Sequence, residues 1–134
     1  KDRKDHLEHL IMPFFKNKKS AYNVVICDRY YYSTYAFQST QGIEFSEIKK
    51  LNQDFLKPNL ALIFDLPAEI AYQRIHINRD YKEKFENLEF MEKLRNNFLK
   101  LKFLLRKDKI KIIDASLSKA DVFKQVKEEA AKFF

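Results

Sequence analysis

Three short, mostly apolar runs, each closed by an aspartate, constrain the fold of this chain more than any other feature. They are VVIC before Asp28, LALIF before Asp65 and IKII before Asp114. Runs with apolar residues on both faces are typical of strands in a parallel sheet that helices cover on both sides. We therefore expect three parallel strands, with the three aspartates along the carboxyl edge of the sheet. In open α/β sheets, ligands bind at that edge.

Segments with apolar residues three and four positions apart separate these runs and predict helices. The expected helices cover residues 4–16, residues 46–56, residues 67–75, a long segment that includes Met91 to Leu105, and a last segment from Ser118 onward. Pro13 should kink or end the first helix, and Ser118 with Asp121 resembles a capping box. Alternation of strands and helices predicts one α/β domain over residues 1–134, with right-handed crossovers.

The segment that follows the first run concentrates chemistry that suits a nucleotide. Asp28 and Arg29 are followed by three tyrosines, and then by Ser33, Phe37 and Gln38. A guanidinium binds phosphate, an aromatic ring stacks on a planar group, and an amide pairs with a base edge. Together they indicate an anionic, planar, hydrogen-bonding ligand such as a nucleoside monophosphate.

Composition narrows the class of protein. The 134 residues carry a net charge of +7, which favours anionic partners. No apolar run approaches the roughly 18 residues that a membrane span needs. The one cysteine, Cys27, suits a reducing compartment, and we expect a cytoplasmic protein. The one glycine, Gly42, excludes a G-x-x-x-x-G-K-[ST] phosphate loop within these residues.

Each candidate residue also has a simpler interpretation. Asp28 and Arg29 could form an ion pair at a strand end, Phe37 could belong to the core, and Arg74 and Arg79 could be solvated surface charges. The basic residues 79–84 could bind nucleic acid, although acids alternate with them, whereas phosphate tracks prefer unbroken positive potential. A non-catalytic nucleotide- or nucleic-acid-binding module is therefore an alternative to an enzyme.

Four segments together resemble the thymidylate kinase family, most closely its archaeal branch, from Lys1 to about Val126. They are Asp2-Arg3 followed by His6; Asp28-Arg29-Tyr30 with Ser33 and Ala36-Phe37-Gln38; Lys57-Pro58-Asn59-Leu60 leading to Asp65-Leu66-Pro67; and Asp114-Ala115-Ser116. The resemblance implies a three-layer, P-loop-kinase-like parallel sheet flanked by helices. It also implies ATP-dependent phosphorylation of dTMP to dTDP with Mg²⁺, and a homodimer. Another deoxynucleoside or nucleotide kinase is the nearer alternative, because such enzymes also place an acid–arginine pair at this strand end.

The same resemblance implies roles on the side of the monophosphate. Arg29 would contact the phosphate and act in catalysis, and Asp28 would orient Arg29 and lie near the magnesium. The implied dTMP site consists of Arg3, Asp28, Arg29, Ser33, Phe37 and Gln38. Phe37 would pack against the deoxyribose, where a 2′-hydroxyl would clash, and Gln38 would bond a base edge.

On the side of ATP, the resemblance implies contacts from Arg74, Arg79, Lys82, Lys84 and Ala115. Arg79, with an implied catalytic role, and the two lysines would belong to a mobile lid over about residues 76–87. The chain resembles the C-terminal two thirds of the family's domain. The first strand and the phosphate loop would lie upstream of Lys1, so we expect residues 1–134 alone to be inactive.

Overall fold

The computed structural model describes residue 5 and residues 7–16, 24–76 and 87–133. Its elements are, in chain order, η1 (Leu7–Ile11, a π-helix), α2 (Met12–Lys16), α3 (Tyr31–Thr40), α4 (Phe45–Asn52), β1 (Ala61–Asp65), α5 (Ala68–His76), α6 (Leu88–Leu104), β2 (Ile110–Asp114) and α7 (Lys119–Ala130). Among these residues, no helix is both long enough and apolar enough to cross a membrane.

The described sheet consists of β1 and β2, which run parallel with Ala61 opposite Ile110 and Asp65 opposite Asp114. Strand residues alternate between the two faces of a sheet. Ala61 and Ile63 therefore share one face with Ile110, and all three are buried there. The last residues of both strands are aspartates, so two of the three predicted aspartates do lie side by side at the carboxyl edge.

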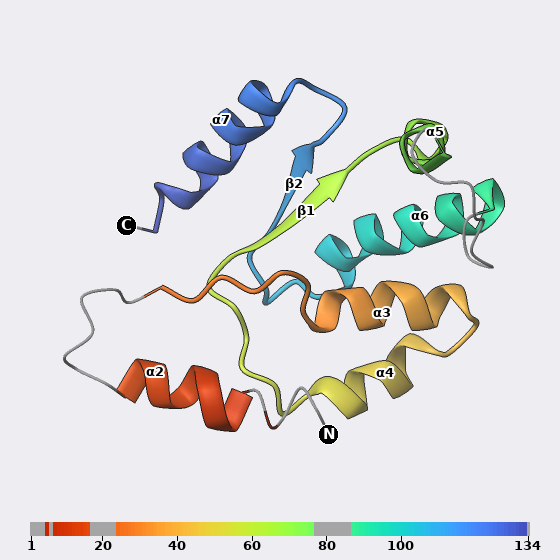
Figure 1. Cartoon of the computed structure of the whole chain (residues 1–134). Coiled ribbons are helices and arrows are strands. Elements are labelled where there is room, and N and C mark those ends of the chain that lie inside the picture. Colours follow the sequence, from red (N-terminus) through yellow and green to blue (C-terminus); the bar gives the residue numbers. More distant parts are fainter. Residues whose placement is uncertain (1–4, 6, 17–23, 77–86, 134) are drawn as a thin grey trace.

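Helices cover both faces of this sheet (Figure 1). On one face α6 packs against both strands, α3 packs against α6, and α4 packs against α3. On the other face α7 packs against β2, where Lys111 forms an ion pair with Glu129 of α7 at 3.3 Å. The result is the expected layered α/β arrangement around a small parallel sheet.

Aromatic residues of α3 form much of the core between α3, α6 and the sheet. The buried cluster consists of Tyr31, Tyr32, Tyr35, Ala36, Ile48, Ala61, Ile63, Leu101 and Ile110. Tyr31 lies edge-on to Tyr35, and Tyr35 stacks on Phe45 of α4 at a centroid distance of 5.0 Å. These contacts fix α3 against the rest of the molecule, and α3 carries most of the described candidate residues.

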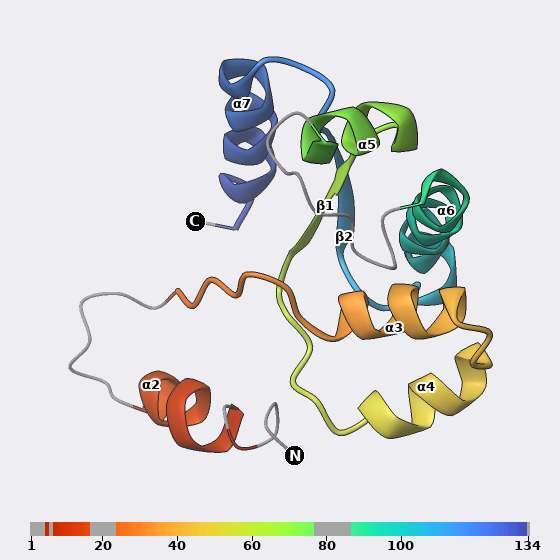
Figure 2. The same cartoon turned by 45° about the vertical axis from the view of Figure 1, so that its right-hand side comes forward.

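The predicted strand at Val24–Cys27 is wrong in this structure. These residues belong to no described strand, and Ile26 is 91% exposed. The physical reason is where α3 is attached. Its first residues bond Asp108, which lies two residues before β2, so α3 begins at the amino-terminal end of the sheet. Figure 2 shows the segment before α3 passing outside the two strands rather than pairing with them.

The same attachment corrects the position of Asp28. The carboxyl edge with Asp65 and Asp114 lies at the opposite end of the strands from Asp108. Asp28 is exposed and lies three residues before Tyr31, outside the sheet. The prediction of three aspartates along one edge therefore holds for Asp65 and Asp114 and fails for Asp28.

Two helix ends follow the local signals in the sequence. The described part of the first predicted helix changes from the π-helix η1 to α2 at Met12, next to Pro13. Proline has no N–H to donate to the carbonyl four residues earlier, which explains the altered winding. At the other end of the chain, Ser118 caps α7 by accepting a hydrogen bond from the Asp121 N–H at 3.2 Å. The capping interaction at Ser118 is thereby confirmed.

Candidate functional site

The segment rich in ligand-binding side chains folds as a bend followed by α3. Asp28 and Arg29 are exposed, and α3 begins two residues later at Tyr31. Arg29 has a φ of +62°, the left-handed region that residues with a Cβ rarely adopt. A non-glycine residue in this region costs about 1–3 kcal/mol, and such residues are concentrated at functional sites. The bend places an exposed guanidinium directly before the helix.

Ser33 and Phe37 lie four residues apart and therefore share a face of α3. Both are half-buried, as is Gln38. The Phe37 ring meets the edge of Phe90 in α6, with centroids 5.4 Å apart. The structure thus brings Ser33, Phe37 and Gln38 onto one helix that α6 flanks, and it makes Phe90 part of the same wall. Sequence reasoning had not singled out Phe90.

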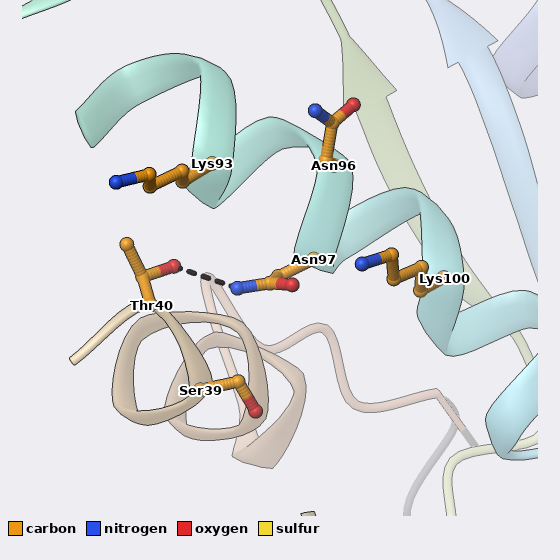
Figure 3. A pocket seen from close by; sticks show the side chains of 6 residues that line it. All are labelled: Ser39, Thr40, Lys93, Asn96, Asn97 and Lys100. Atoms are coloured by element: carbon orange, nitrogen blue, oxygen red, sulfur yellow. Dashed lines mark hydrogen bonds between the residues drawn. The ribbon is translucent and has the colours of Figure 1, made fainter. Parts of the chain in front are cut away.

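A polar pocket of about 250 Å³ opens between the last turn of α3 and α6 (Figure 3). Its lining consists of Ser39, Thr40, Lys93, Asn96, Asn97 and Lys100. Asn97 donates its side-chain N–H to the Thr40 hydroxyl at 3.0 Å, and this bond ties the two helices together. Lys93 is paired with Glu89 on the same helix at 2.6 Å. None of the predicted site residues lines this pocket, although Gln38 is adjacent to it in the chain.

At the carboxyl edge of the sheet, Arg95 of α6 holds Asp65 with two hydrogen bonds. Its Nε and Nη2 donate to the two carboxylate oxygens at 2.7 and 2.9 Å. These bonds lower the pKa of Asp65 from its ordinary value. The neighbouring carboxylate of Asp114 accepts bonds from the backbone N–H and hydroxyl of Ser116, and these bonds lower the pKa of Asp114. Both carboxylates therefore stay ionised. Arg95 was missed because an arginine within a long amphipathic helix carries no signal of its partner.

Two of the residues expected near ATP lie together. Arg74, near the end of α5, donates from Nη1 to the backbone oxygen of Ala115 at 3.3 Å. Ala115 directly follows β2, and its own N–H donates to the backbone carbonyl oxygen of Asp65 at 2.8 Å. The loop after β2 is therefore tied both to β1 and to α5.

Several predicted site residues lie outside the described part of the chain. These are Arg3, Arg79, Lys82 and Lys84, together with most of the predicted lid over residues 76–87.

For magnesium, Asp28 offers one hard oxygen ligand, which is the type that Mg²⁺ prefers. Within the described residues, no three His, Cys, Asp or Glu side chains are grouped to hold a metal ion. Asp28 therefore fits Mg²⁺ only as a single protein ligand. This matches the usual arrangement in which water and substrate phosphates complete the coordination.

Comparison with known proteins adds to this geometry. The family model described as thymidylate kinase matches residues 1–126. The chain belongs to the thymidylate kinase family. The resemblance read from the sequence is thereby confirmed, and the small parallel sheet flanked by helices agrees with the family's α/β fold class.

The relatives are mostly archaeal. A probable thymidylate kinase of Pyrococcus horikoshii is 31% identical over 125 residues, which is 93% of this chain and 58% of that protein. One from Thermococcus onnurineus is 33% identical over 126 residues, again 93% of this chain and 58% of the relative. The thymidylate kinase of Brachyspira hyodysenteriae is 37% identical over 98 residues, 72% of this chain and 46% of that protein. The chain thus spans less than two thirds of the length of these thymidylate kinases.

Proposed function

We propose that the protein containing this chain is a thymidylate kinase, which transfers the γ-phosphoryl group of ATP to dTMP and releases dTDP and ADP. The observation that carries the proposal is the family match over residues 1–126. It coincides with the segment from Asp28 to Gln38, in which an exposed Asp-Arg pair is followed by a helix that presents a hydroxyl, a ring and an amide. These groups suit the phosphate, sugar and base of dTMP in turn.

In this proposal Arg29 binds the monophosphate through its planar fork of donors. Asp28 supplies an oxygen that orients Arg29 and lies near the magnesium of the reacting complex. In the described structure the start of α3 and the Arg74–Ala115 group lie at opposite ends of the strands, so phosphoryl transfer requires that the two come together in the assembled active site. Bound Mg²⁺ neutralises charge on the transferring phosphoryl group. Phe37, held edge-on by Phe90, forms a wall that packs against the deoxyribose, and Gln38 bonds the base. Ser33 lies one helical turn before Phe37 and completes the polar side of the site.

The ATP side of the proposal rests on the group formed by Arg74 and Ala115. The Arg74 guanidinium is exposed and donates a hydrogen bond to the backbone oxygen of Ala115. A guanidinium at this place can stack on the adenine ring. Arg79, Lys82 and Lys84, in the predicted lid, would close over the phosphates, exclude water and stabilise the transferred charge. Arg3 would contact the nucleotide near its base.

A cytoplasmic location and a homodimer belong to the same proposal. Substrates that are nucleotides, and a chain with a single cysteine, suit a reducing compartment. Sedimentation of the purified protein across a range of concentrations tests the homodimer.

A coupled assay of ADP release tests the activity. The protein, expressed from its complete reading frame, is mixed with ATP and Mg²⁺ and then with thymidine, deoxyuridine, uridine or deoxyguanosine monophosphate. We expect turnover with dTMP, weaker turnover with dUMP and little with UMP or dGMP. Phosphorylation of thymidine itself would favour a deoxynucleoside kinase. Absence of turnover with every acceptor, despite binding, would favour a non-catalytic module.

A further inference from the structure

A buried carboxylate lies under the first turn of α3. Asp108, in the connection between α6 and β2, has a side chain that is only 3% exposed. Its Oδ2 accepts a hydrogen bond from the Tyr31 hydroxyl at 2.7 Å and another from the Tyr32 hydroxyl at 3.0 Å. The Nζ atom of Lys57 lies 3.6 Å from the other oxygen, Oδ1. Three segments far apart in the sequence therefore meet at one carboxylate.

Burial of this group is costly, and packing alone does not require it. Taking a carboxylate out of water costs several kcal/mol, and apolar side chains of similar volume stabilise a core at least as well. The hydroxyls of Tyr31 and Tyr32 remain donors at any physiological pH, because burial and the neighbouring carboxylate raise the pKa of both phenols. A polar network of this kind allows only one position of the helix, because its hydrogen bonds require a defined geometry. An apolar contact would allow several positions.

Arg29 lies directly before the part of α3 that this hydrogen-bond network holds. Tyr31 is the first residue of α3, and Arg29 lies two residues before it with its strained φ of +62°. The N-cap residue, Tyr30, does not cap the helix with its side chain. The usual means of defining a helix start is therefore replaced by hydrogen bonds from the first two helical residues to Asp108. A strained residue persists only when its surroundings determine its conformation.

We propose that Asp108 is a positioning residue, which holds the first turn of α3 so that the Arg29 guanidinium is presented to the substrate phosphate. The proposal rests on the proposed function, because it assigns a phosphate to Arg29. It extends that function to a residue far away in sequence that touches no substrate.

A comparison of two ligands separates this role from a purely structural one. Thymidine lacks the phosphate and dTMP carries it, so the ratio of their dissociation constants reports phosphate recognition alone. Titration calorimetry on the protein expressed from its complete reading frame gives both values. Arg29→Ala should reduce the preference for dTMP over thymidine by about tenfold or more, the usual effect of losing a charge-assisted pair.

Three changes at the network test the proposal. Asp108→Ala should reduce the same preference about three- to tenfold. Asp108→Asn keeps an oxygen that can accept hydrogen bonds from both hydroxyls, so this variant should keep most of the wild-type preference for dTMP over thymidine. The combined variant Tyr31→Phe, Tyr32→Phe, Asp108→Leu leaves no buried polar group unsatisfied and should fold well, yet it should lose the preference as Asp108→Ala does. Urea unfolding of each variant accompanies the binding measurement.

Asn97→Ala is the matched control, because it removes a hydrogen bond between α3 and α6 at the other end of α3. This variant should leave the ratio of the thymidine and dTMP dissociation constants unchanged. The positioning role is overturned if the combined variant is folded and keeps the wild-type ratio while Arg29→Ala loses it; the proposed function then stands. If Arg29→Ala itself leaves the ratio unchanged, the phosphate site at Arg29 fails, and the role of Asp108 fails with it.

Discussion

Arg29 combines an exposed guanidinium with a backbone conformation that is costly for any residue with a Cβ. The sequence singles out the residue as a candidate, because an Asp-Arg pair precedes a cluster of hydroxyl, aromatic and amide groups. It does not identify the conformation. The bend at Arg29 directly precedes α3, whose first residue bonds Asp108, 77 positions further along the chain, and no local sequence pattern shows such a contact.

Replacement of Arg29 by alanine should weaken dTMP binding by about 2 kcal/mol, roughly 30-fold in Kd, since a charged hydrogen-bonding partner of the phosphate is lost. Stability should change little, because the side chain is exposed. Calorimetric titration with dTMP and a thermal melt measure the two effects. Arg106→Ala removes another exposed arginine and serves as the control. Unchanged affinity for dTMP would contradict the assignment.

The pair formed by Asp65 and Arg95 gives the molecule a pH-dependent component of stability. Arg95 lowers the pKa of Asp65, so the folded protein binds that proton less tightly than the unfolded chain. The stabilisation is therefore present above the ordinary pKa of an aspartate, near 4. It is lost as the pH falls through the lower value in the folded state.

Arg95→Gln should accordingly destabilise the protein by about 1 kcal/mol at pH 7, a modest value because the pair is partly solvated. The difference from wild type should shrink as the pH falls below about 4 and then through the lowered pKa of Asp65 in the folded wild type, because Asp65 is then protonated in both proteins. Urea unfolding of both proteins across this pH range measures the difference in their free energies of unfolding. Arg106→Gln should show no such convergence. A difference that stays constant with pH would mean that Arg95 acts through packing and not through its charge.

At the scale of elements, the sequence predicts β1, β2 and the helices with strong 3.6-residue periodicity, and it misses α3. Its residues YYSTYAFQST are rich in tyrosine, serine and threonine, which are poor helix formers. No residue at its start offers an N-cap side chain. Burial of the three tyrosines Tyr31, Tyr32 and Tyr35 against α6 and α4 outweighs that weak propensity. Val24–Cys27 shows the reverse, since its apolar residues suit a strand but no described strand pairs with it.

The packing of α6 against α3 and the sheet provides a test at this scale. Leu101 is 2% exposed within the core, whereas Leu51 on α4 is 75% exposed. Leu101→Ala should lower the free energy of unfolding by about 2–4 kcal/mol, because it removes buried methyl groups and leaves a cavity. Leu51→Ala makes the same chemical change on a helix surface and should cost below about 0.5 kcal/mol. Urea denaturation measures both, and equal losses would contradict the packing described for α6.

At the scale of the whole molecule, the sequence predicts the fold class and the family, but it does not predict how the elements are arranged around the sheet. The family's fold class follows from strand–helix alternation, and the family itself follows from four short segments read together. The position of Asp28 relative to Asp65 and Asp114 could not be read in this way, because it depends on which end of the sheet α3 is attached to. The pocket between α3 and α6 is also invisible in sequence, since its six polar residues form no recognisable pattern.

A triphosphate is normally held by the backbone N–H groups of a glycine-rich turn, together with the lysine and hydroxyl of that turn. The single glycine of this sequence, Gly42, cannot build such a turn. Burying phosphates without these donors is strongly unfavourable. Residues 1–134 expressed alone should therefore show no measurable turnover in the coupled ADP assay with ATP, Mg²⁺ and dTMP, and should bind ATP weakly. The protein expressed from its complete reading frame is the comparison. Robust, dTMP-dependent turnover by the 134-residue chain would show that its own residues can replace the phosphate loop.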